Sequence, residues 1–158
     1  MAQAPDTSPL GKRYILDSSA LAVYMNGVAG HDEVLRILVA ARAKRTAAYL
    51  TMFSLAEFLS EEERGGGVDR SRAAWAKVQQ LPIKFVDIDR ALALAGAHIK
   101  ARYSLKGGDP FAAALAERQQ GILVTSNADY RKLDGLVMIE WLPRGASRET
   151  SPQKTQST

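Results

Sequence analysis

Four acidic positions lie at expected turns of the sequence, where their carboxylates could do chemistry together. If they meet, their negative charges repel one another and raise their pKa values, so a cation should sit among them. The sequence contains no cysteine, and oxygen ligands without thiolates favour Mg²⁺ or Mn²⁺. The immediate motifs hold no lysine or arginine except Arg131 and Lys132. The candidate metal ligands are Asp17, Glu57, Asp109 and the Asn127/Asp129 pair.

Carboxylates that hold Mg²⁺ most often serve phosphoryl chemistry. Two such ions, about 3.5–4 Å apart, can activate a water and stabilise the leaving oxygen during in-line attack on a phosphodiester. This chemistry needs no histidine. Nearby hydroxyl groups could hold water or a phosphate at the same place, although helix capping and turn formation also explain them. These supporting residues are Ser18, Ser19, Thr125 and Ser126.

Each acidic position also has a purely local explanation. An acid directly before a helix can cap its first turn, and Ser-x-x-Glu can form a capping box. Asp-Pro can start a helix with proline at its first position, and Asn-x-Asp can form an Asx turn. From the residues alone, the local and the chemical explanations both stay open. In that order, the positions are Asp17, Ser54 with Glu57, Asp109 with Pro110, and Asn127 with Asp129.

The elements that must position these residues alternate between short apolar runs and segments with helical periodicity. Strands that are separated by helices cannot pair as hairpins, so the pattern predicts an α/β protein whose parallel sheet is covered on both faces. Loops from distant units then converge at the carboxyl ends of the strands, where ligands bind. The predicted strands are 13–16, 47–51, 83–86, 122–125 and 136–139, and the predicted helices are 20–25, 32–44, 54–64, 69–80, one reaching about 103, and 109–121.

Particular residues predict where two of these helices begin and end. Asp32 is available to cap the helix that it begins. Three consecutive glycines, Gly65–Gly67, end the helix that begins at Ser54 and form a flexible loop. Apolar positions on two helices could form a homodimer face, a groove for a partner, or simply the core. They are Leu35, Leu38 and Val39, and Leu55, Phe58 and Leu59.

Length and composition limit the possible classes of protein. The 158 residues suit one domain, expected at 13–143 between disordered tails at 1–12 and 144–158. With 46% hydrophobic and 24% charged residues, the chain is neither disordered nor membrane-embedded. No apolar run approaches the roughly 20 residues that span a bilayer, and the N-terminus lacks the apolar centre of a signal peptide, so a cytoplasmic protein without membrane contact is expected. The net charge of +4 mildly favours a polyanionic partner.

Four stretches and a closing segment follow one another with an order and spacing that span nearly the whole core, about residues 13–142: 16–21, 54–58, 108–116, 122–130 and 135–141. They resemble the motifs of the PIN domain family, specifically the VapC-type toxin nucleases of bacterial toxin–antitoxin systems. The resemblance implies a three-layer α/β/α sandwich with a mainly parallel sheet. It also implies Mg²⁺- or Mn²⁺-dependent cleavage of RNA, such as tRNA or another structured RNA, and neutralisation by a VapB-like antitoxin.

The resemblance also assigns roles to the acidic residues. Asp17, Glu57 and Asp109 match the family's catalytic acids, and Asp129 is the expected fourth. Asn127 stands where the family often has an acid, so it would be a secondary oxygen ligand or would hold water, and a second metal would bind more weakly. The neutral Asn127 also keeps open a catalytically weakened module that binds RNA or protein.

The sequence disfavours one other phosphate-handling site and leaves one other nuclease chemistry open. A haloacid-dehalogenase-type phosphatase needs a second aspartate two positions after Asp17, where Ser19 stands. His31 and His98 are the only histidines, so a two-histidine acid–base ribonuclease is arithmetically possible. Packing is the simpler explanation for both, since one lies at a loop–helix junction and the other in mid-helix.

Overall fold

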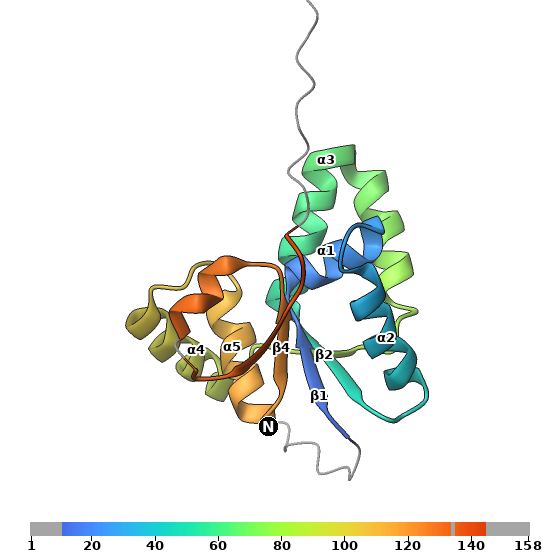
Figure 1. Ribbon diagram of the computed structural model, residues 1–158. Helices are drawn as coiled ribbons and strands as arrows, with labels where there is room; N and C mark the ends of the chain where they lie inside the picture. Colours follow the sequence, from blue (N-terminus) through green and yellow to red (C-terminus); the bar gives the residue numbers. More distant parts are fainter. Residues whose placement is uncertain (1–10, 134, 145–158) are drawn as a thin grey trace, which may run out of the picture.

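The computed structural model describes residues 11–133 and 135–144, which form a five-stranded sheet between two layers of helices (Figure 1). The strand order is β3-β2-β1-β4-β5, and all neighbouring pairs are parallel. The predicted three-layer α/β/α class with a mainly parallel sheet is therefore confirmed. The tails expected at 1–12 and 144–158 lie outside the described residues except for 11, 12 and 144. The strands are β1 Arg13–Leu16, β2 Ala47–Thr51, β3 Lys84–Val86, β4 Ile122–Thr125 and β5 Met138–Trp141.

The helices divide between the two faces of the sheet according to their place in the chain (Figure 1). The chain runs from β1 to one edge at β3 and then continues on the other side of β1 with β4. In such sheets the crevice for ligands lies at the carboxyl ends of the two strands where the order reverses. Helices α1 Ser18–Asn26, α2 His31–Arg42 and α3 Met52–Val78 cover one face, α4 Arg90–Tyr103 and α5 Asp109–Gln119 cover the other, and the 3₁₀ helix η1 Ala128–Leu133 follows β4.

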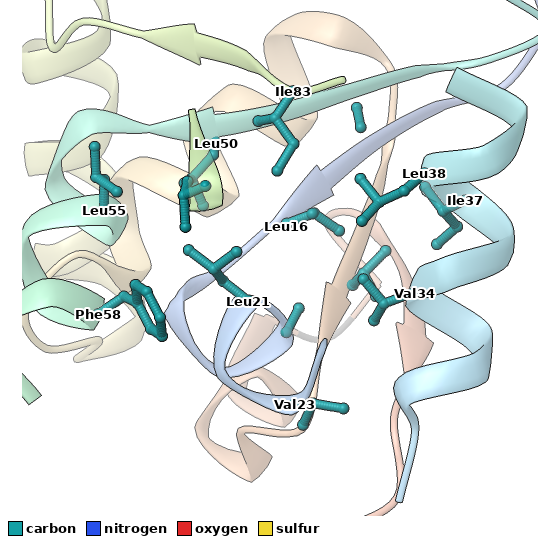
Figure 2. Packing of buried hydrophobic residues seen from close by; sticks show 14 of the residues in the cluster. Leu16, Leu21, Val23, Val34, Ile37, Leu38, Leu50, Leu55, Phe58 and Ile83 are labelled. Carbon is teal, nitrogen blue, oxygen red and sulfur yellow. The ribbon is translucent and has the colours of Figure 1, made fainter. Parts of the chain in front are cut away.

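The inner strands β1, β2 and β4 are largely buried, and their alternate residues belong to two separate cores. Ile15 packs with the α4–α5 side, and its neighbour Leu16 packs with the α1–α3 side. Because successive strand residues point to opposite faces, a continuous apolar run is what a covered parallel strand needs. Figure 2 shows the core on the α1–α3 side, which includes Leu16, Leu21, Leu38, Leu50, Leu55 and Phe58.

The helix starts differ from those predicted. Gly30, in a left-handed conformation, is the N-cap of α2, so Asp32 lies inside the first turn and does not cap it. Thr51 caps α3 by accepting the amide N–H of Ser54 at 3.0 Å. The capping box of Ser54 and Glu57, which the sequence left open, is therefore not formed, because the hydroxyl of Thr51, three residues earlier, occupies the capping position.

The three glycines do not form a loop. Gly65 and Gly66 continue the helix, and only Gly67 leaves it, with φ 82° and ψ 179°. The two arms that meet at Gly67 lie side by side, since the Ser71 hydroxyl donates to the Leu59 carbonyl at 3.2 Å. The prediction of a helix end at Gly65 is therefore wrong, because the reversal needs only one residue with positive φ.

The last strand begins two residues later than predicted. β5 pairs Ile122 with Met138 and Thr125 with Trp141, and Leu142 N–H donates to the Thr125 carbonyl at 2.8 Å. The apolar residues Leu136 and Val137 precede the strand and pack against the α4–α5 core.

None of the helices in the described part of the chain combines the length and apolar character needed to cross a bilayer.

Candidate active site

Asp17 lies at the centre of the site, directly after β1 and at the start of α1. Asp17 is 2% exposed, and its carboxylate accepts the amide N–H of Ala20 at 2.8 Å. The expected helix cap is therefore confirmed. Burial raises the pKa of Asp17, and the hydrogen bonds that it accepts only partly oppose that rise.

Two hydroxyl groups connect Asp17 to the end of β4. Ser19 donates to Oδ1 at 2.6 Å, and Thr125 donates to Oδ2 at 2.5 Å. These same hydroxyls accept the backbone N–H groups of Ser126 and Asn127 at 3.0 and 2.9 Å. Because the Ser19 and Thr125 hydroxyls are themselves held by backbone N–H groups, the Asp17 carboxylate has one defined orientation. Ser18 and Ser126 are half-buried at the same rim.

Glu57 approaches the rim from the second turn of α3. Its carboxylate is hydrogen-bonded to the backbone of Gly108. A Cβ atom at Gly107 or Gly108 would lie 2.7 or 2.4 Å from its oxygens, so a larger residue at either position would displace the carboxylate from where it lies. Burial and the negative charge of Asp17 raise the pKa of Glu57, and the Gly108 contact opposes them.

Asp109 is the first residue of α5 and not its cap, which is Gly108. The Tyr130 hydroxyl donates to Oδ1 at 3.1 Å, and the Asn127 side-chain amide donates to Oδ2 at 2.9 Å. Burial raises the pKa of Asp109 to about 6, against the hydrogen bond from Tyr130 and with help from nearby carboxylates. Asp109 is therefore held at two points in a place that disfavours its charge.

Asn127 and Asp129 form the expected Asx turn, since Asn127 Oδ1 accepts the amide N–H of Asp129 at 3.0 Å. With its Nδ2 atom on Asp109, the Asn127 side chain contacts both acidic positions. Asp129 is exposed at the edge of the site, and its charge contributes to the raised pKa of Asp109. That Asn127 and Asp129 are metal ligands stays a prediction.

The donor set fits a divalent cation in its chemistry. All donors are oxygens, and the pKa values of Asp17, Glu57 and Asp109 are raised by causes that include no neighbouring cation. As the side chains stand, no three aspartate, glutamate or histidine residues within 11–133 and 135–144 are arranged to hold one ion. A shared ion therefore requires these side chains to turn toward one another.

The two histidines do not meet. His31 stacks on Tyr24 with ring centroids 4.9 Å apart and lies on the α1–α3 side of the sheet. His98 lies in α4 on the opposite side. A two-histidine acid–base site is therefore excluded.

Comparison with known proteins identifies the family. A family model described as "PIN domain" matches residues 14–136. The chain belongs to the PIN domain family. The predicted family is thus confirmed, although a search of curated proteins found no match.

Several solved structures with a similar fold are VapBC or VapC proteins. VapBC2 from Rickettsia felis, bound to a DNA fragment from its promoter, has a TM-score of 0.67 at 14% identity and covers 83% of this PIN domain chain and 99% of its own. VapC20 from Mycobacterium tuberculosis, a sarcin–ricin loop cleaving toxin, has a TM-score of 0.64 at 16% identity, and the match covers 82% of this chain and 99% of VapC20. DNA-bound VapBC from Salmonella typhimurium has a TM-score of 0.63 at 17% identity, and the match covers 82% of this chain and 98% of the other.

Sequence reasoning missed two residues beside the acids of this PIN domain. Tyr130 is fully buried and contacts Asp109, but in the sequence it is indistinguishable from an ordinary core aromatic. Phe53 lies one helical turn before Glu57 and is 39% exposed. Its i to i+4 spacing from an acid, on one helix face, was the available signal.

Proposed function

We propose that the chain is a divalent-metal-dependent endoribonuclease toxin of the VapC kind, which cuts tRNA or another structured RNA. The observation that supports it best is that Asp17, Glu57 and Asp109 lie near enough to one another for their charges to interact, and that all three have raised pKa values. Membership of the PIN domain family adds to it. VapC20, a structural neighbour, cleaves the sarcin–ricin loop.

In this proposal, Asp17, Glu57 and Asp109 hold Mg²⁺ or Mn²⁺, with Asp129 and Asn127 at the edge. When bound, such an ion supplies the charge that activates water and stabilises the leaving oxygen of a phosphodiester. Asp17 contributes a carboxylate fixed by Ser19 and Thr125.

The remaining residues of the site hold the Asp109 carboxylate in place and offer contacts to the substrate phosphate. Tyr130 and Asn127 fix Asp109, and Ser18 and Ser126 lie where hydroxyls could contact a phosphate. Because the Tyr130 hydroxyl and the Asn127 amide are hydrogen-bonded to Asp109, their dipoles are already oriented before the substrate arrives.

RNA cleavage tests the proposal. The purified chain is incubated with total RNA and Mg²⁺ or Mn²⁺, with EDTA and Asp17→Asn as controls. We expect cleavage that needs both the metal and the carboxylate. Intact RNA under every metal condition would exclude the nuclease.

A second candidate is a PIN domain that binds RNA or protein with weakened catalysis. Two observations favour it: Asn127 is neutral, and within 11–133 and 135–144 no three acids are arranged to hold one ion as they stand. In the same assay it would bind RNA or a protein partner without cutting RNA. Buried carboxylates are unfavourable without a function, which argues for the nuclease.

We also propose a VapB-like antitoxin and a homodimer. A cavity of about 310 Å³ between α2 and the segment that follows α3 is lined by Leu35, Val39, Leu81 and Pro82 among others. Val39 is 54% exposed, so an apolar peptide could cover it. Expression of the gene with and without the small reading frame expected directly upstream tests the partner, since only its deletion should be toxic.

A further inference from the structure

An aromatic pair lies beside the acidic site and takes no part in the proposed chemistry. Phe53 in the first turn of α3 stacks on Phe111 of α5, with ring centroids 5.4 Å apart and 24° between the planes. These helices also carry Glu57 and Asp109. The pair therefore connects the two elements that present these acids.

The rings are held in place by close contacts with backbone. A Cβ at Gly96 would lie 2.5 Å from the Phe111 ring, so that ring packs directly on α4. A Cβ at Gly108 would lie 2.8 Å from Phe53 and 2.4 Å from the Glu57 carboxylate. The Phe53 ring and the Glu57 carboxylate thus lie side by side over one glycine. Phe53 is nevertheless 39% exposed, so part of its ring is open to a ligand.

Positive charge lies on the segments next to the pair. Lys106 is exposed in the loop that leads into Gly107 and Gly108. Lys132 of η1 is also exposed and donates to the Ser104 carbonyl of the same loop at 3.4 Å. Lysines near an aromatic face are a combination that binds nucleic acid, because the lysines contact phosphates and the ring stacks on bases.

We propose that the exposed face of Phe53, supported by Phe111, stacks on an unpaired nucleobase next to the phosphate at the acidic site. This inference rests on the proposed function and assigns Phe53 as a residue that contacts its substrate. Bases inside an A-form duplex are already stacked on both sides and cannot reach such a ring, whereas bases of loops and single strands can. Stacking on a ring without hydrogen bonds tolerates any base.

Binding of a labelled single-stranded RNA of about 12 nucleotides tests this. The full chain carries Asp109→Asn throughout, so that the RNA stays intact, and affinity is measured by fluorescence anisotropy. Phe53→Leu keeps an apolar side chain without the aromatic face and should bind about tenfold more weakly. Phe53→Tyr keeps the ring and should restore affinity. Leu94→Ala changes another exposed apolar residue, on α4, as the matched control and should leave affinity unchanged.

Three results would overturn the inference. Phe53→Leu could bind as tightly as its parent, or the same RNA as a duplex could bind equally well. Phe53→Leu could also convert a dimer to a monomer in sedimentation equilibrium, which would assign the ring to a contact between copies. Metal-dependent cleavage by the chain with Asp109 intact, measured in parallel, separates the two proposals. If it persists, only stacking fails; if RNA is neither bound nor cut, the proposed function fails as well.

Discussion

At the scale of single residues, the protonation of Asp109 links stability to activity. Burial is the main cause that raises its pKa from 3.8 to about 6. The folded protein therefore binds more protons than the unfolded chain between these values. Stability is lost as the pH rises through this window, and the loss is complete above about pH 6. In the absence of metal, the folded protein is thus less stable with Asp109 ionised than it would be with a neutral side chain there.

Asp109→Asn should therefore stabilise the metal-free protein while it abolishes cleavage. Since solvent screens this half-buried group, we expect the free energy of unfolding to rise by about 1–2 kcal/mol at about pH 7.5. The difference should vanish below about pH 4, where the aspartate is protonated in both states. Urea denaturation in EDTA at the two pH values measures it. A variant less stable than the wild type at the higher pH would contradict the pKa shift.

Tyr130 is expected to act through Asp109. Its buried hydroxyl donates to Oδ1 at 3.1 Å and lowers the Asp109 pKa. Tyr130→Phe keeps the packing and removes this donor, so the pKa of Asp109 should rise further. The acid limb of the pH–rate profile for RNA cleavage should move up by about one pH unit. Tyr14→Phe, at the other end of β1, is the control, and an unmoved limb in Tyr130→Phe would refute the role.

At the scale of elements, α3 depends on one glycine for its reversal. Gly67 has φ 82° and ψ 179°, a conformation open almost only to glycine. Gly67→Ala should destabilise the fold by about 1–3 kcal/mol. Gly65→Ala is the matched control, because Gly65 is helical and a Cβ there meets nothing closer than 3.7 Å.

The control should stabilise by about 0.5–1 kcal/mol, since alanine restricts the unfolded chain and suits a helix. Thermal unfolding of the three proteins measures both effects. Equal stability of the two variants would show that the reversal does not lie at Gly67. Neither change touches the acids, so cleavage at low temperature should persist in both.

The elements also show why some helix ends could not be predicted. Thr51 and Ser54 are both capping residues three positions apart, and the hydrophobic pattern does not choose between them. The choice depends on where β2 ends, because Thr51 is still paired with Val86 of β3. The glycine run likewise gives no sign of which residue takes the positive φ. Both outcomes are decided by packing.

At the scale of the whole molecule, the fold class followed from sequence patterns because parallel strands buried on both faces need continuous apolar runs. The same reasoning located the acids at strand ends, and the structure brings Asp17, Glu57, Asp109 and Asp129 to one rim. The strand order was not predictable, since pairing is decided between distant segments. The contacts of Tyr130 and Phe53 arise only when α3, α5 and η1 meet.

The arrangement of the molecule places its most buried carboxylate at the reversal of strand order. Asp17 follows β1, and its partner Thr125 ends β4. A divalent ion at this point would be held by segments that are about 40 and 90 residues away from Asp17 along the chain. Metal binding should therefore stabilise the folded state as a whole.

Crystals of the wild-type chain soaked in MnCl₂ test most directly whether these segments hold a divalent ion. We expect an anomalous scattering peak about 2.0–2.6 Å from carboxylate oxygens of Asp17, Glu57 and Asp109, with the last two side chains turned toward it. The peak should be lost in Asp109→Asn crystals. Manganese bound only elsewhere, with the three carboxylates left on their own backbone and hydroxyl partners, would contradict a metal-dependent nuclease.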